Sequence, residues 1–303
     1  MYAFLQLQPV STGITQTQRF VVPKGEPVQK IATRLAEDGL IRNPWAFRLT
    51  VKLDKVESKL QAGSFELSPS MSLREIGQKL STGTNDVWVT IPEGWRREEI
   101  AQSLSKLELG SYNAAEFLRV TEGLEGKLFP DTYLVPREMT SQALANVLTN
   151  TFEKKIEIGL ADEIEASDHD FESALVMASL IEREARGYEE MRHVAGILWH
   201  RIAIGMPLQV DATLQYSKGY SATQQSWWVS PTAADKAVDS PFNTYSNPGL
   251  PPRPICNPGL DAVRAALNPL ETDDLFYLHD GQGVIHYGRT LDEHNANVVR
   301  YLK

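Results

Sequence analysis

The sequence predicts an α+β protein in two parts, a small α/β module at residues 18–86 and a larger mixed α+β domain at residues 87–303. Three observations lead to this prediction. A strand–turn–helix pattern occurs twice, a long helix carries two glutamates near its end, and a β-hairpin pattern precedes a final helix. Residues 1–17, rich in Ser, Thr and Gln, are interpreted as a polar tail. A chain of 303 residues is long enough for two domains.

The repeated pattern consists of a short strand, a turn with Pro and Gly two residues apart, and an amphipathic helix. Its two copies span residues 20–35 and 89–104. A further strand–turn–helix lies between them, where Ser72 and Glu75 have the spacing of a helix capping box. Strand–helix–helix–strand units of this size resemble LysM-type modules, which bind N-acetylated glycans. The alternative is a small module that only supports its neighbour.

Composition narrows the classes of function. The net charge of −9 and the pI near 5.3 argue against a nucleic-acid partner, which would need a basic surface. Cys256 is the only cysteine, so neither an internal disulfide nor a cysteine-based metal site can form. The six histidines form no metal-binding motif, and no stretch reaches 18 apolar residues. We therefore expect the chain as given to be soluble and to hold no metal.

The helix predicted at residues 171–187 places a carboxyl group in an apolar stripe. This stripe includes Met177, Leu180 and Ile181. Glu184 follows them by seven, four and three residues, so it shares their side of the helix. Burial there would raise the pKa of the carboxyl and keep it protonated near neutral pH, as a general acid requires. The alternative is a structural carboxyl that meets an arginine or a backbone amide.

The neighbouring Glu182 falls on the opposite side of the same helix. It precedes Arg186 by four residues, the favourable order for an exposed ion pair. We therefore predict that Glu182 is a surface residue, whereas Glu184 is held in an apolar wall.

Residues 208–214 are compatible with two local structures that place their polar side chains differently. If this segment is extended, Gln209, Asp211 and Thr213 face the same side. If it begins a helix with Asp211 as N-cap, the row is broken.

The C-terminal third combines loops with regular structure. Residues 240–245 and 249–255 are dense in Pro, Gly and Asn, which indicates long functional loops. Residues 275–278 and 284–287 have the pattern of a β-hairpin, and a closing helix is expected to reach Leu302.

Several blocks of the sequence, in order, closely resemble the YceG-like (MltG-type) endolytic murein transglycosylases. The blocks are residues 178–184, 201–213, 242–245 and 249–255, with residues 128–133, 257–259 and 294–295 in support. The resemblance extends from about residue 20 to the end, and it makes residues 87–303 a YceG-type catalytic domain. It implies cleavage of peptidoglycan between N-acetylmuramic acid (MurNAc) and N-acetylglucosamine (GlcNAc), with a 1,6-anhydro sugar as product.

The resemblance also implies roles for individual residues. Glu184 matches the single catalytic glutamate of the family, and no cofactor is implied. The cleft residues that would orient sugar or stabilise positive charge are Gln209, Asp211, Thr213, Tyr216, Asn243, Thr244 and Tyr245. For Asp211 a structural N-cap is the alternative, and Tyr216 is equally compatible with the core. Arg253 stands where the family commonly has a small Gly.

The family implication extends to location and partners. Members are anchored by an N-terminal membrane-spanning helix and are located at the extracytoplasmic face of the bacterial inner membrane. Residues 1–17 are therefore expected to be a remnant of the linker that follows this anchor. Cell-wall synthases are the implied partners besides glycan strands. Two other functions remain open: a non-catalytic glycan-binding scaffold of cell-wall synthesis, and a muramidase in which Asp211 supplies a second carboxylate.

Overall fold

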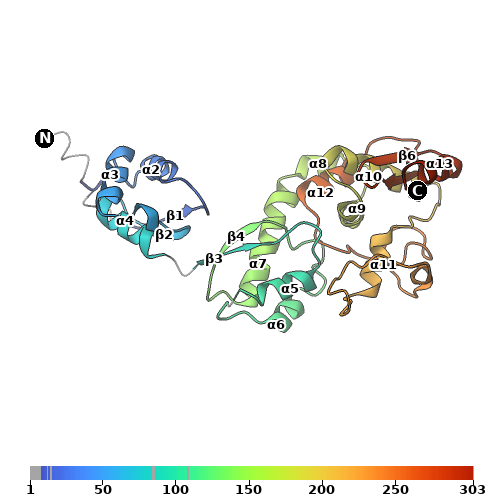
Figure 1. Cartoon of the computed structure of the whole chain (residues 1–303), viewed down its shortest axis with the longest axis horizontal. Helices are drawn as coiled ribbons and strands as arrows, with labels where there is room; N and C mark the ends of the chain where they lie inside the picture. Colours follow the sequence, from blue (N-terminus) through green and yellow to red (C-terminus); the bar gives the residue numbers. More distant parts are fainter. Residues whose placement is uncertain (1–7, 12, 14–15, 84–85, 108, 303) are drawn as a thin grey trace. The chain divides into compact units, whose positions relative to one another are not determined.

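The computed structural model describes residues 8–11, 13, 16–83, 86–107 and 109–302. Its helices and two-stranded sheets confirm the α+β class. The chain divides into two compact units (Figure 1). The first comprises Met1–Val89 and Thr132–Glu138, and the second comprises Thr90–Asp131 and Met139–Lys303. The boundary expected at residues 83–86 includes Thr84 and Asn85, which lie outside the described residues.

The first unit contains two strand pairs, and the second of them, at residues 86–90 and 132–136, lies at its boundary. The first pair and its helices are β1 (Gln18–Val22), α2 (Val28–Glu37), α3 (Pro44–Leu53), η1 (Glu57–Lys59), β2 (Gly63–Leu67) and α4 (Leu73–Thr82). Phe20 of β1 lies opposite Phe65 of β2, and both are buried with the apolar faces of the helices. The predicted capping box is confirmed, because Ser72 N donates to Glu75 Oε2 at 2.7 Å and Glu75 N to Ser72 Oγ at 3.3 Å. Of the tail, Pro9 and Val10 offer carbonyls to Arg42.

The repeated strand–turn–helix pattern is also confirmed. β3 (Asp86–Thr90), which pairs with β4 (Thr132–Pro136), leads into α5 (Arg97–Leu104) as β1 leads into α2. Gly25 and Gly94 take φ values of 79° and 74° in the two turns, a left-handed conformation that favours glycine.

The second unit is mainly helical. After α5 its elements are α6 (Ala114–Val120), α7 (Ser141–Phe152), a π-helical turn η2 (Glu153–Ile158), α8 (Ala161–Ala166), α9 (Phe171–Glu184), α10 (Tyr188–Ala203), α11 (Asp211–Lys218), η3 (Ala233–Ala237), α12 (Leu260–Leu267), β5 (Phe276–His279), β6 (Ile285–Gly288) and α13 (Leu291–Tyr301).

Helix α9 is the centre of this unit. It begins at the N-cap Asp170, whose carboxylate accepts from Ser173 N at 2.9 Å, and it packs against α10, α11 and α12 (Figure 1). Every residue from Ala174 to Ile181 is buried. The helix therefore has no exposed face along these turns, whereas the sequence pattern predicted an apolar stripe opposite a polar side.

The C-terminal hairpin and closing helix are confirmed. β5 and β6 pair antiparallel, with Tyr277 opposite Tyr287. Their turn is held by Asp280, which accepts from the backbone of Gln282 and Val284 and pairs with His286 at 3.0 Å. Across the described part of the chain, no helix combines the length and the apolar character needed to cross a membrane.

Candidate active site

Glu184 lies where α9 ends and the chain turns extended at Ala185. Its Oε2 accepts a hydrogen bond from the Tyr277 hydroxyl of β5 at 3.0 Å. Burial raises the pKa of Glu184, and the nearby charge of Asp211 acts in the same direction. The hydrogen bonds from Tyr277 and from the Ala212 backbone oppose this rise. The site therefore contains a carboxyl that favours its protonated form, in contact with a second element of the fold.

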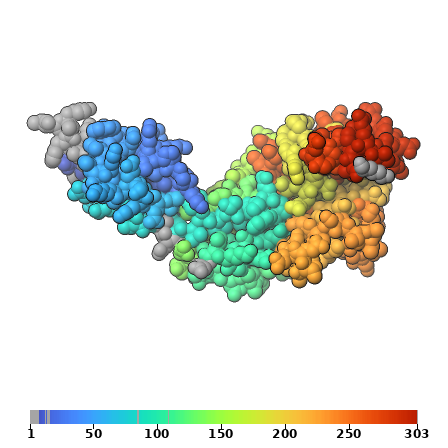
Figure 2. Space-filling model, viewed as in Figure 1, coloured from blue at the N-terminus to red at the C-terminus, as the bar shows by residue number. Residues whose placement is uncertain are grey.

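Two cavities share Glu184. The first, here called the hairpin cavity, has a volume of about 560 Å³ and is lined by residues 182–186 and 279–283. The second, the α11 cavity, has a volume of about 390 Å³. It is lined by Glu184, Arg201, Leu208, Gln209, Asp211, Lys236, Tyr245, Phe276, Tyr277, Leu291 and His294. In the space-filling view the orange segment around α11 and the red C-terminal hairpin and helix meet at one end of the second unit (Figure 2).

The α11 cavity is organised by hydrogen bonds between its own walls. Tyr245 donates its hydroxyl to Asp211 Oδ1 at 2.6 Å. The largely buried Arg201 donates to the carbonyls of Leu208 and Leu275 at 2.7 Å. Gln209 has a φ of 52°, a conformation that costs a non-glycine residue free energy and is common at functional sites.

Known proteins match the chain over nearly its whole length. The model of the YceG-like family matches residues 20–300. The chain belongs to the YceG-like family. A relative from Bacillus subtilis, named endolytic murein transglycosylase, is 30% identical over 100% of this chain and 89% of its own length. A Streptococcus pneumoniae protein of the same name is 27% identical over 99% of this chain, which spans only 61% of that relative's length.

A solved structure agrees with this membership. The crystal structure of a YceG-like protein from Listeria monocytogenes is 27% identical in sequence and superposes with a TM-score of 0.62. The match covers 93% of this chain and 99% of the Listeria chain, so the family fold extends over both units of this YceG-like chain.

The structure brings four of the sequence-predicted residues of this YceG-like chain together. Glu184, Gln209, Asp211 and Tyr245 all line the α11 cavity. Asp211 is the first residue of α11, whose N-cap is Val210. Residues 211–214 are therefore helical, and the row expected of an extended segment does not form. The N-cap role that the helical alternative gave to Asp211 was wrong, because the helix begins one residue earlier than that alternative assumed.

Three other predicted residues are buried next to the α11 cavity and line neither of the two cavities. Thr213, Asn243 and Thr244 are at most 1% exposed. Thr244 Oγ1 accepts from Val210 N at 3.0 Å and lies 3.0 Å from Thr213 Oγ1. The Asn243 amide donates to the carbonyls of two residues in the preceding loop. Because these side chains are buried, they cannot contact a ligand in either cavity. Their hydrogen bonds instead hold the loop against the start of α11.

Tyr216 lies on the next turn of α11 and packs away from the α11 cavity. Its ring lies 4.7 Å from that of Phe242, and the Arg96 guanidinium lies over its other side at 4.1 Å. The structure thus places Tyr216 in a cation–π cluster at the edge of the core.

Glu182 is not the surface residue that the helical pattern predicted. Its Oε2 accepts from Gly259 N at 2.9 Å, and burial raises its pKa to about 7. Among the described residues no ion pair joins it to Arg186. The prediction was wrong because it considered one helix alone, whereas the loop before α12 covers this side of α9.

The sequence pattern missed Tyr277, which holds Glu184. Alternation along β5 offers the one available signal, since it separates Tyr277 from Phe276 and Leu278. Arg201 was also missed, although an arginine at a core position of α10 is an unusual feature. His294, noted only as part of a family motif, lines the α11 cavity.

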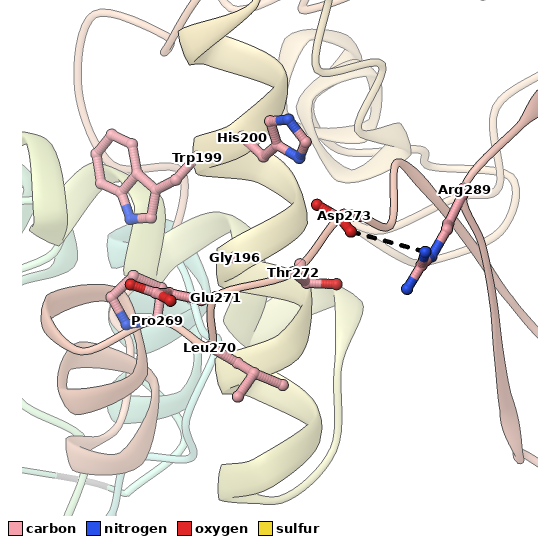
Figure 3. A pocket seen from close by; sticks show the side chains of 9 residues that line it. All are labelled: Gly196, Trp199, His200, Pro269, Leu270, Glu271, Thr272, Asp273 and Arg289. Atoms are coloured by element: carbon pink, nitrogen blue, oxygen red, sulfur yellow. Dashed lines mark ion pairs between the residues drawn. The ribbon is translucent and has the colours of Figure 1, made fainter.

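A third cavity lies apart from these residues. It has a volume of about 580 Å³ and lies between α10 and residues 269–273, with Trp199 and His200 on one side and the Asp273–Arg289 ion pair on the other (Figure 3). None of the sequence-predicted site residues lines it. Within the described residues, no group of three or more His, Cys, Asp or Glu side chains is arranged to hold a metal ion.

Proposed function

We propose that this chain is an endolytic peptidoglycan lytic transglycosylase that cleaves the MurNAc–GlcNAc bond. The observation that carries the proposal is the position of Glu184, a carboxyl with a raised pKa that is shared by two cavities. An enzyme that cuts inside a polymer needs room on both sides of its acid. The names of the Bacillus and Streptococcus relatives support the same activity.

The proposed chemistry uses one carboxyl group twice. Protonated Glu184 donates its proton to the glycosidic oxygen as the bond from this oxygen to C1 of MurNAc breaks. The resulting carboxylate accepts the proton of the C6 hydroxyl of the same sugar while O6 bonds to C1. Water is not consumed, the product is 1,6-anhydro-MurNAc, and Glu184 ends protonated. No cofactor is required by these steps.

The surrounding residues support these two proton transfers. Tyr277 fixes one carboxyl oxygen of Glu184, so the other is left to face the glycosidic bond. The Asp211 charge raises the pKa of Glu184, and the Ala212 backbone amide at the start of α11 favours the carboxylate that forms next. Gln209, Asp211 and Tyr245 are the proposed sugar contacts, and the buried Thr213, Asn243 and Thr244 support the backbone that carries them.

We further infer that the first unit is a LysM-like module that binds glycan. Its β1–α2–α3–β2 order with antiparallel strands supports this inference. Peptidoglycan lies outside the cytoplasmic membrane, so the proposed activity places the chain at the extracytoplasmic face. A membrane anchor and cell-wall synthase partners belong to the same proposal.

Product analysis tests the proposed reaction. Glycan strands would be incubated with the protein in H₂¹⁸O and the new ends identified by mass spectrometry. We expect anhydro-MurNAc ends without ¹⁸O. Reducing ends that carry ¹⁸O would instead establish a muramidase, which is the second candidate because Asp211 lines the same cavity as Glu184. Strand binding without cleavage would favour the glycan-binding scaffold.

A further inference from the structure

The hairpin cavity contains two arginines that form no ion pair among the described residues. Arg183 and Arg186 both line it, beside Glu184. The ion pairs found among the described residues include neither guanidinium. Arg183 lies over the Trp228 ring at 4.0 Å, and its Nε is buried without a hydrogen-bond partner. Arg186 is exposed, and its guanidinium lies close to Gly283 in the hairpin turn.

The acidic side chains of the same cavity have hydrogen-bond partners other than the two arginines. Asp280 holds the hairpin turn and pairs with His286. Glu182 accepts from Gly259 N, and its pKa is raised to about 7. Glu184 is the partly buried acid with a raised pKa. The hairpin cavity therefore holds two guanidinium groups beside the acid, and a planar guanidinium favours a carboxylate as its partner.

The α11 cavity differs in this respect. Its carboxylate, Asp211, is bound by a neutral tyrosine hydroxyl. Its Arg201 is already occupied by two backbone carbonyls. Lys236 lies over the Tyr245 ring at 4.7 Å on the exposed η3 turn. This cavity is therefore less suited than the hairpin cavity to an anionic substituent.

The two sugars at the scissile bond differ in the same way. GlcNAc is neutral, whereas MurNAc carries a 3-O-lactyl group whose carboxylate is anionic in peptide-free strands. We infer that the hairpin cavity takes the MurNAc that supplies C1, with its lactyl carboxylate on Arg183 and Arg186. The neutral GlcNAc leaving group then occupies the α11 cavity. This inference rests on the proposed function and fixes the direction in which a strand runs through the site.

The test measures strand binding in a Glu184→Gln background, so it does not depend on cleavage. Isothermal titration calorimetry would compare peptide-free glycan strands with the same strands after conversion of the lactyl carboxyls to methyl amides. We expect the anionic strands to bind about tenfold more tightly. Adding Arg186→Ala is expected to remove this preference and leave the Kd of the amidated strands unchanged. Arg289→Ala, the same charge change at an exposed arginine of the third cavity, is the control.

The results separate the two proposals. Equal binding of anionic and amidated strands, equal weakening of both by Arg186→Ala, or no strand binding at all would overturn the inference about the hairpin cavity. Absence of anhydro ends with the wild-type protein would overturn the proposed reaction, and the binding comparison would remain readable. Arg183→Gln keeps a planar group over Trp228 and should weaken the binding of anionic strands in the same way.

Discussion

The hairpin cavity and the α11 cavity meet at one carboxyl group and differ in almost every other respect. The hairpin cavity is formed by the end of α9 and a β-turn, and its two arginines, Arg183 and Arg186, form no ion pair among the described residues. The α11 cavity is formed by the start of α11, two residues of β5 and parts of α10, η3 and α13, with Asp211 and Tyr245 hydrogen-bonded across it.

This difference shows how the two cavities contribute differently to the function of one acid. Burial raises the pKa of Glu184, and three groups on the α11 side act with or against it: the Asp211 charge raises it, and Tyr277 and the Ala212 amide lower it. On the hairpin side His279 also lowers it. The hairpin side adds charges suited to recognise an anionic substrate group. Most of the tuning of the acid thus comes from the α11 side, and substitutions of Arg183 or Arg186 should affect substrate selection without changing the pKa of Glu184.

Asp211→Asn should give the largest change in acid strength. Removing the negative charge lowers the pKa of Glu184, so the pH above which the acid loses its proton moves down. We expect activity at pH 7 to fall several-fold and to recover at lower pH, because a lower pKa leaves a smaller fraction of Glu184 protonated. The pH dependence of kcat/KM measures this shift. An unchanged profile would show that Asp211 does not tune Glu184, and Asp273→Asn is the control.

Tyr277→Phe should shift the same profile in the opposite direction. Loss of the hydrogen bond to Glu184 Oε2 raises the pKa of the acid, so activity should persist to higher pH while kcat falls several-fold from poorer positioning. Tyr287→Phe removes a hydroxyl from the opposite position on β6 and is expected to leave the profile unchanged. Equal shifts in the two variants would contradict the positioning role of Tyr277.

Glu182→Gln should change stability more than activity. The folded-state pKa of about 7 lies above the ordinary value of 4.5, so the group's contribution to stability is fully present below about pH 4.5 and lost as the pH rises through 7. We expect the Tm of the wild type to fall more than that of Glu182→Gln between pH 5 and 8, by at least about 2 °C. Calorimetry at the two pH values measures this. Parallel losses of Tm would contradict it, and turnover should stay within about twofold.

Elements that depend on neighbouring residues could be predicted from the sequence. The capping box of Ser72 and Glu75 lies within one helical turn, and β5 and β6 pair through a short turn. Both were predicted and both are confirmed. The start of α11 was left open between strand and helix, because Leu208 to Leu214 fits either period until the Thr244 contact fixes Val210 as N-cap.

The site could be predicted only in part, because its decisive contacts join distant segments. Tyr277 is 93 residues from Glu184, and Gly259 is 77 residues from Glu182. A helical-wheel argument contains neither contact, which is why it placed Glu182 at the surface. Glu184 was predicted both from the helix pattern and from the resemblance to the YceG-like family, which also implied seven cleft residues. That only Gln209, Asp211 and Tyr245 of these seven line the α11 cavity, and that Thr213 and Thr244 are buried, required the structure.

Comparison of Glu184→Gln with Glu182→Gln tests whether Glu184 is the catalytic acid. The two substitutions are identical, lie two residues apart at the end of α9 and remove carboxyls that both have raised pKa values. Turnover of peptidoglycan strands and strand binding would be measured for both. We predict that Glu184→Gln lowers turnover by about 10³-fold with binding retained, whereas Glu182→Gln changes it by about twofold or less. Equal losses in both variants, or a Glu184→Gln protein that still cleaves at the wild-type rate, would contradict the account.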